Sequence, residues 1–383
     1  MTDQHLLTGG DDAAEYGQSV PVRAHQPLWR RVLSVAITVA VLVVVFGFVL
    51  PKLADYDAVV GYLSDVSGIE WVVLGALALA FLAAYPVVLM QTMRSLRFPE
   101  ALVNHLTGTA VTNAVPSGGA IALPLNYAMY MSWGFTPGII SAGMLGAGVW
   151  DWLARIALPV IAVFVVALTG NAVPWMWAVS IAGAVVVAAM VFGVARLLAS
   201  DRAAEGMAGF TDRVGGWVFG VVRRDNPGIH DMVMRFRTDL KRIVDHRILR
   251  LSAATVANHA AMAALFTASI YAVGVSTDDI TVAWVVLAFT LGRFLVMIPV
   301  SPGGLGLVDL GWIGILTLGW QATTGVPVDA DRLAAGVLLF RALSFLPPIP
   351  IGMGTWLFWR SNRSWRQPWQ VVRRGTSQDQ PPG

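Results

Sequence analysis

Between Ala101 and Trp150 the chain runs for 50 residues without a single Asp, Glu, Lys or Arg. Across all 383 residues only 13% are charged and 56% are hydrophobic, whereas soluble domains carry about 25% charged residues. So little polar surface cannot cover a folded protein of this size in water, and a disordered chain would need the opposite composition. The sequence therefore predicts an all-α, multi-pass membrane protein.

The composition also excludes several kinds of functional site. The chain has no cysteine, which removes disulfides, cysteine zinc sites, iron–sulfur clusters and thiol nucleophiles. The six histidines show no metal-binding spacing, and Walker, GxSxG and HExxH motifs are absent from the sequence. The 26 basic residues stand at the ends of apolar runs and form no single patch, so nucleic-acid binding is not expected. We expect no cofactor, no metal and no enzyme activity.

Long apolar runs mark the expected helices. Because a helix needs about 20 apolar residues to cross the hydrocarbon core, we expect about six to eight transmembrane helices. They would lie in a membrane domain over residues 29–360, between disordered cytoplasmic tails at 1–28 and 361–383. The runs are Val32–Leu50, Trp71–Met93, Ala101–Trp150, Gly138–Leu168, Ala172–Ala195, Leu251–Ser276, Ile280–Pro299, Leu305–Trp320 and Leu333–Trp359.

The distribution of arginine indicates the orientation of these helices. Basic residues concentrate in segments 30–31, 94–97, 196–250 and 360–366, and the alternate loops are acidic or uncharged. Because positive loops stay in the cytoplasm, we expect both termini inside the cell and an even number of crossings of the cytoplasmic membrane. Residues 199–250 also carry apolar side chains among their arginines. This mixture favours an amphipathic helix on the anionic leaflet over a solvated connector.

Two apolar regions are broken by Pro, Ser and Gly. Proline removes a helix hydrogen bond and Gly-Gly opens the backbone, and the freed groups must be buried in protein or line a polar cavity. The segments beside each break are too short to cross alone. We therefore expect two re-entrant helical hairpins that enter from opposite sides, as in an inverted repeat; loops at the membrane surface are the alternative. The breaks contain Asn113, Pro116, Ser117, Gly118, Gly119 and Asn126, and Ser301, Gly303 and Gly304.

Five charged residues lie within apolar sequence, namely Asp151, Arg155, Arg293, Asp309 and Arg341. A charge at such depth usually faces a partner or a wet cavity. Asp151 and Arg155 are four residues apart and can pair on one helix face, either at a site or as a self-neutralising pair near an interface. Snorkelling to the headgroups is the alternative for Arg293 and Arg341, and for Arg341 a further alternative is a structural pair with Asp309 or Asp151. Three arginines near opened helix ends suit a hydrophobic ligand that bears a phosphate.

The chain resembles one known family in two motifs. Residues 298–309, Ile-Pro-Val-Ser-Pro-Gly-Gly-Leu-Gly-Leu-Val-Asp, followed by an apolar helix and Phe340-Arg341, resemble the signature of the lysylphosphatidylglycerol synthase transmembrane-region family. Residues 113–119 resemble its first motif, and Trp150-Asp151 resembles the acidic position that follows it. The resemblance covers roughly Trp71–Trp359 and implies a flippase-type domain. Known members move aminoacylated phosphatidylglycerol between leaflets, and relatives are tied to polyprenyl-linked glycolipid pathways.

Two departures from the family pattern stand out. Asp309 occupies a position where the family usually has Glu, which shortens the side chain by one methylene. Residues 120–130 lack the acidic and the basic residue that normally continue the first motif. The longest hydrophilic stretch, about 50 residues, is shorter than a transferase domain of about 100–200 residues. We therefore expect that the chain does not itself synthesise the lysyl lipid.

Three functions are left open at this stage. The first is flippase-like translocation of a phosphate-bearing lipid, with the break residues and the five charged residues binding the headgroup. The second is a non-transporting subunit that presents a lipid-phosphate carrier to a separate glycosyltransferase. The third is a secondary transporter of a small solute. The expected partners are anionic membrane lipids and a separate lipid synthase or glycosyltransferase.

Overall fold

The computed structural model of the chain describes residues 56–114, 118–169, 174–202, 205–206, 209, 229–297, 304 and 306–365. The predicted N-terminal tail, the first apolar run and residues 366–383 of the predicted C-terminal tail lie outside these residues, as do residues 203–204, 207–208 and 210–228 of the basic loop. The same holds for Pro116, Ser117, Ser301 and Gly303 in the two breaks. Every regular element within the described ranges is a helix, which confirms the all-α prediction for them.

Long apolar helices dominate the described chain. Five segments are long and apolar enough to cross a membrane, namely 68–92, 137–168, 176–197, 247–272 and 330–361. In chain order the helices are α4 (Tyr56–Ser64), α5 (Gly68–Thr92), α6 (Phe98–Ala114), α7 (Gly118–Ser132), α8 (Pro137–Leu168), α9 (Pro174–Ala199), α11 (Ile229–Ala272), α12 (Val282–Leu295), α13 (Leu307–Thr324), α14 (Ala330–Phe345) and α15 (Pro348–Ser361).

Local sequence explains where these helices begin and end. The Ser67 hydroxyl accepts from the amide of Glu70, whose carboxylate in turn accepts from the amide of Ser67, so a capping box starts α5. Helix α11 begins directly after Pro227-Gly228 and contains no Gly or Pro over its 44 residues. The chain turns soon after its end, at Gly274, whose φ of 82° favours glycine. Residues 229–250 were expected to belong to an amphipathic segment on the membrane surface, but they form one continuous helix with the membrane span that follows.

The last apolar run also differs from its expected form. Leu333–Trp359 was predicted as one span, but α14 ends at Phe345 and α15 begins at Pro348. Pro347 and Pro348 cannot donate backbone hydrogen bonds to the preceding turn, which explains the interruption. The break leaves the carbonyl of Phe345 available to a side chain from another helix.

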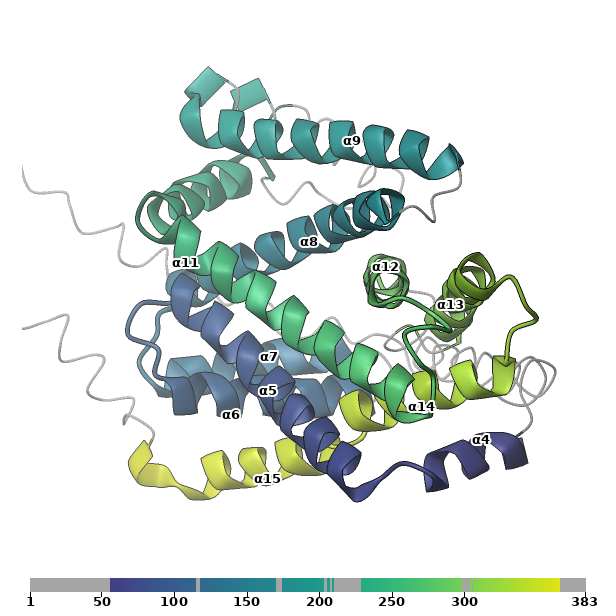
Figure 1. Ribbon diagram of the computed structural model, residues 1–383. Coiled ribbons are helices and arrows are strands. Elements are labelled where there is room, and N and C mark those ends of the chain that lie inside the picture. The colour runs from purple at the N-terminus through teal and green to yellow at the C-terminus, as the bar shows by residue number, and fades with distance from the viewer. Residues whose placement is uncertain are drawn as a thin grey trace, which may run out of the picture.

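Two pairs of short helices occupy the broken regions. Helix α6 packs on α7, and α12 packs on α13. Helix α6 also packs along α15, as α12 packs along α8, while α5 and α11 run side by side (Figure 1). Each short pair therefore contacts a helix from the other half of the chain.

Contacts at the two ends of the bundle group the loops as the charge pattern predicts. At one end the Tyr62 hydroxyl donates to Asp329 at 2.8 Å, and Arg332 donates to the carbonyl of Gly274 at 3.1 Å. The hydrogen bond to Asp329 raises the pKa of Tyr62, because it favours the protonated phenol. At the other end Arg247 donates to the carbonyl of Met90 at 3.3 Å. The acidic loops thus share one end and the basic segments share the other.

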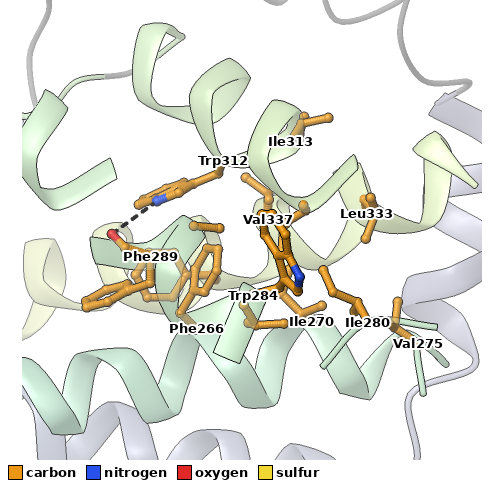
Figure 2. Packing of buried hydrophobic residues seen from close by; sticks show 14 of the residues in the cluster. Phe266, Ile270, Val275, Ile280, Trp284, Phe289, Trp312, Ile313, Leu333 and Val337 are labelled. Atoms are coloured by element: carbon orange, nitrogen blue, oxygen red, sulfur yellow. Dashed lines mark hydrogen bonds between the residues drawn. The ribbon is translucent and has the colours of Figure 1, made fainter. Parts of the chain in front are cut away.

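Two hydrophobic cores divide the bundle along its length. One core surrounds α12 and α13 and includes Phe266, Phe289, Trp312 and Phe340, whose rings pack against one another from four helices (Figure 2). The other surrounds α6 and α7 and takes residues from the opposite halves of α5, α8 and α11. In α8, residues up to Trp150 belong to one core and residues from Ala162 belong to the other. Polar side chains occupy the layer between them.

Candidate functional site

The first charged cluster in this layer joins α8 to α11. Arg155 donates from Nε to Asp151 Oδ2 at 2.7 Å, and its Nη2 lies 2.6 Å from the same oxygen. The other carboxylate oxygen, Oδ1, lies 3.2 Å from Nε2 of His259, which is only 2% exposed. The pairing of Asp151 with Arg155 predicted from their spacing is confirmed. His259, expected to pack or to hydrogen-bond between helices, lies in ion-pair distance of Asp151 on the neighbouring helix.

The second charged cluster joins α13 to α14. Arg341 donates from Nε to Asp309 Oδ1 at 2.5 Å, and its guanidinium lies 4.7 Å from the ring centre of Trp312. Asp309 Oδ2 accepts from the amide of Gly306 at 2.9 Å, so it also caps the start of α13. Both side chains are largely buried, at 13% and 5% exposure. The alternative that Arg341 snorkels to the headgroups is wrong, because its charge pairs inside the protein.

Arg293 lies between these two clusters. It stands in the last turn of α12, next to the second break, and interacts electrostatically with Asp151, Arg155 and Arg341. Its Nε is buried and has no hydrogen-bond acceptor among the residues that the structure describes. Among the described residues of the polar layer, three arginines against two aspartates leave one positive charge. The layer is therefore suited to an anion, and Arg293 is the cation that carries the surplus.

Residues beside the two breaks contact α14. Asn113, at the end of α6, donates from Nδ2 to the carbonyl of Phe345, the last residue of α14, at 3.1 Å. Asp309, in the first turn of α13, binds Arg341, which lies one turn before Phe345 on α14. Residues from both broken regions thus contact a single turn of α14.

A cavity of about 230 Å³ lies against the first break. Asn113 and Asn126, both predicted as site residues, line it together with Tyr85 and Tyr130. Tyr85 also interacts electrostatically with Asp151, Arg155 and Arg293. The cavity and the charged layer are therefore adjacent, and Tyr85 lies between them.

The glycines of the two breaks have different roles. Gly118 is buried, and a Cβ there would lie 2.2 Å from the carbonyl oxygen of Val111, so close helix packing requires glycine. Gly119 faces open space. Gly304 has a φ of 72°, and a Cβ would lie 2.5 Å from the side chain of Val308. Gly118 and Gly304 thus allow the chain to reverse within the bundle.

The sequence did not single out three of the residues that build the site. Tyr85 and Tyr130 stand in apolar helices, where an aromatic residue is normally a packing residue. Asn104, which donates to the carbonyl of Asn126, is buried at 2% exposure. Buried amides require partners, so an Asn in an apolar run is the signal that could have identified Asn104.

Two comparisons with known proteins bear on the chain. A family model described as Lysylphosphatidylglycerol synthase TM region matches residues 30–352. No curated protein matches the chain. The matched range contains both broken regions, both charged clusters and the cavity.

Proposed function

Because this chain belongs to the lysylphosphatidylglycerol synthase transmembrane-region family, we propose that it is a flippase-like translocator of a phosphate-bearing lipid. The phosphate would bind at Arg293, within the layer between the two cores. The acyl chains would stay in the surrounding membrane. The surplus positive charge at Arg293 is the observation that carries this proposal. The other charges around it are paired, and its planar guanidinium can bind a phosphate through two parallel hydrogen bonds.

The arrangement of the short helices supports re-entrant hairpins that enter from opposite sides. Trp359, at the basic end of the bundle, donates to Ser132 at the end of α7 at 3.0 Å, and α6 follows the basic segment 94–97. The Tyr271 hydroxyl donates to the carbonyl of Ile280, just before α12, at 2.9 Å. The loop after α13 leads to Asp329 at the acidic end. Each hairpin thus begins and ends at one end of the bundle, which is the arrangement of an inverted repeat.

Replacement of Arg293 by Gln tests the function. Purified protein is reconstituted into vesicles with a fluorescent phosphatidylglycerol, and dithionite bleaches the label in the outer leaflet. We expect Arg293→Gln to slow lipid movement by at least about tenfold, the effect of losing a charge-assisted hydrogen bond. The variant should remain folded, because removal of an uncompensated charge lowers a desolvation cost. Arg293→Lys should not restore the rate, since an ammonium lacks the planar fork of guanidinium.

Arg250→Gln is the matched control, because this arginine is exposed on α11 and stands apart from the charged layer. Its rate should equal that of the unmodified protein. Lipid movement at an unchanged rate in Arg293→Gln would contradict the proposal. Unmodified protein that binds the lipid but moves none would favour the subunit that presents a lipid to a separate enzyme.

Single cysteines test the proposed orientation. The chain has no native cysteine, so Ser200→Cys at the basic end and Ser276→Cys in the acidic loop give unambiguous labels. In intact cells a membrane-impermeant maleimide should label Ser276→Cys alone, because basic segments stay in the cytoplasm. Permeabilised cells, in which both should react, provide the control. Labelling of both positions in intact cells would contradict the orientation.

A further inference from the structure

The cavity beside the first break is lined by apolar residues and by several polar side chains, His105 among them. Asn104, Thr112, Asn113, Asn126 and Tyr130 are among the residues that line it. None of the described residues around it is Asp, Glu, Lys or Arg. Amides and hydroxyls in such number are unusual within a membrane bundle, because each needs a hydrogen-bond partner away from water.

Two of these groups lack a partner within the described protein. The amide oxygen of Asn126 and the hydroxyl of Tyr130 are both buried and accept or donate no hydrogen bond among the described residues. The Tyr130 side chain has 0% exposure. The Asn126 amide rests on Gly108, where a Cβ would lie 2.8 Å from both its nitrogen and its oxygen. These groups are held in place facing the cavity, and an unpaired polar group of this kind is rare unless a ligand or water satisfies it.

Other amides in the lining are already in use by the protein. Asn104 donates to the carbonyl of Asn126 at 3.1 Å, and Asn113 donates to Phe345. The protein therefore engages the amide donors of Asn104 and Asn113 and leaves an unpaired acceptor at Asn126 and an unpaired hydroxyl at Tyr130. A ligand with several hydroxyl groups matches this set, because each hydroxyl both donates and accepts.

A cationic headgroup does not match it. The two described carboxylates of the polar layer, Asp151 and Asp309, are both engaged by arginines, and an ammonium in the cavity would have no counter-ion. The volume of about 230 Å³ is below the roughly 300–1,000 Å³ of pockets for drug-sized ligands. It fits one polyol or sugar unit and not a whole lipid.

We propose that this cavity selects an uncharged, hydroxyl-rich headgroup, a polyol or a single sugar, on the lipid whose phosphate binds at Arg293. Tyr85 lines the cavity and interacts electrostatically with Arg293, so a headgroup in the cavity would lie near a phosphate bound at Arg293. This inference rests on the proposed translocation and specifies its substrate class. It excludes an aminoacyl headgroup as the preferred cargo.

The test compares four fluorescent lipids in the vesicle assay. They are phosphatidylinositol, phosphatidylglycerol, phosphatidic acid and lysylphosphatidylglycerol. We expect phosphatidylinositol to move fastest, and lysylphosphatidylglycerol to move slowest. Tyr130→Phe, which removes one oxygen, should slow phosphatidylinositol by about three- to tenfold, the effect of one neutral hydrogen bond. Movement of phosphatidic acid, which has no headgroup to fill the cavity, should not change.

Tyr127→Phe is the matched control. It makes the same substitution one turn earlier in α7, at a hydroxyl that hydrogen-bonds to Ser141 and is not among the residues that line the cavity. It should leave all four rates unchanged. Asn126→Leu, which removes the unpaired amide oxygen, should repeat the effect of Tyr130→Phe.

A binding measurement separates failure of this inference from failure of the proposed function. Glycerophosphoinositol should raise the thermal unfolding temperature of the detergent-purified protein more than glycerol phosphate does, and Tyr130→Phe should abolish the difference. If lipids move but the four rates are equal, or if lysylphosphatidylglycerol moves fastest, the headgroup inference is overturned and translocation stands. If no lipid moves but the binding difference is present, translocation is overturned and the headgroup selectivity stands.

Discussion

Replacement of Arg341 by Ala is expected to destabilise the protein by about 3–5 kcal/mol, the cost of leaving a buried carboxylate without its partner. Asp309 is 4% exposed and would keep only the amide of Gly306 as a hydrogen-bond donor that the described contacts provide. The variant should unfold several degrees lower in a thermal scan in detergent. A second substitution, Asp309→Asn, should restore most of the loss, because it removes the stranded charge.

Arg360→Ala is the control for this experiment. Arg360 also lies over an aromatic ring, that of Trp356 at 5.3 Å, but it is exposed. Its removal should change stability by less than about 0.5 kcal/mol. An Arg341→Ala protein that is fully stable but inactive would instead make this arginine a ligand of the transported anion. A protein both stable and fully active would show that Arg341 matters for neither role.

Gly352→Ala is expected to be nearly as disruptive, through packing and not charge. A Cβ at this position would lie 2.1 Å from the carbonyl oxygen of Leu106 and 2.5 Å from the Cβ of Ala110. The first atom belongs to the backbone of α6, so α6 and α15 must separate to make room. Overpacking of this kind costs about 1–3 kcal/mol, and it should also weaken the hydrogen bond between Thr107 and Thr355.

Gly354→Ala provides the comparison, since nothing lies within 4 Å of a Cβ built there. On the same helix, this change should be neutral or stabilising by up to about 1 kcal/mol, because Ala favours helix over Gly. The thermal unfolding temperatures of the two variants in one detergent give the answer. Equal temperatures would show that α6 and α15 are not in close contact.

Local signals in the sequence predicted much of the fold. Apolar runs located α5, α8 and α9 to within a few residues. A membrane-spanning helix needs a long run of apolar residues, and such a run can be read directly from the sequence. The positions of Pro and Gly located both breaks, because the tendency to interrupt a helix is also a property of individual residues. The division of the last span at Pro347 was missed although the prolines were visible, since apolar composition alone was used to define it.

The site was predictable only in part. Asp151 and Arg155 could be paired from their spacing on one helix, but Asp309 and Arg341 are 32 residues apart on separate helices. The sequence left open whether Arg341 would pair with Asp309 or with Asp151, because the choice depends on how α13 packs on α14. The contact of His259 with Asp151 likewise depends on packing, at the interface of α8 and α11. Tyr85 and Tyr130 were overlooked because a tyrosine in an apolar helix can serve packing through its ring or hydrogen bonding through its hydroxyl.

The surplus charge at Arg293 has a consequence for the energy source of the proposed lipid translocation. Arg293 lies in the last turn of α12 and, as part of the protein, would not cross the membrane with a headgroup. A cargo with one phosphate charge therefore carries a net charge of its own across the membrane. An inside-negative potential favours its outward movement by roughly 2.3 kcal/mol per 100 mV. The membrane voltage alone could then enrich such a lipid in the outer leaflet, without ATP and without a coupled ion.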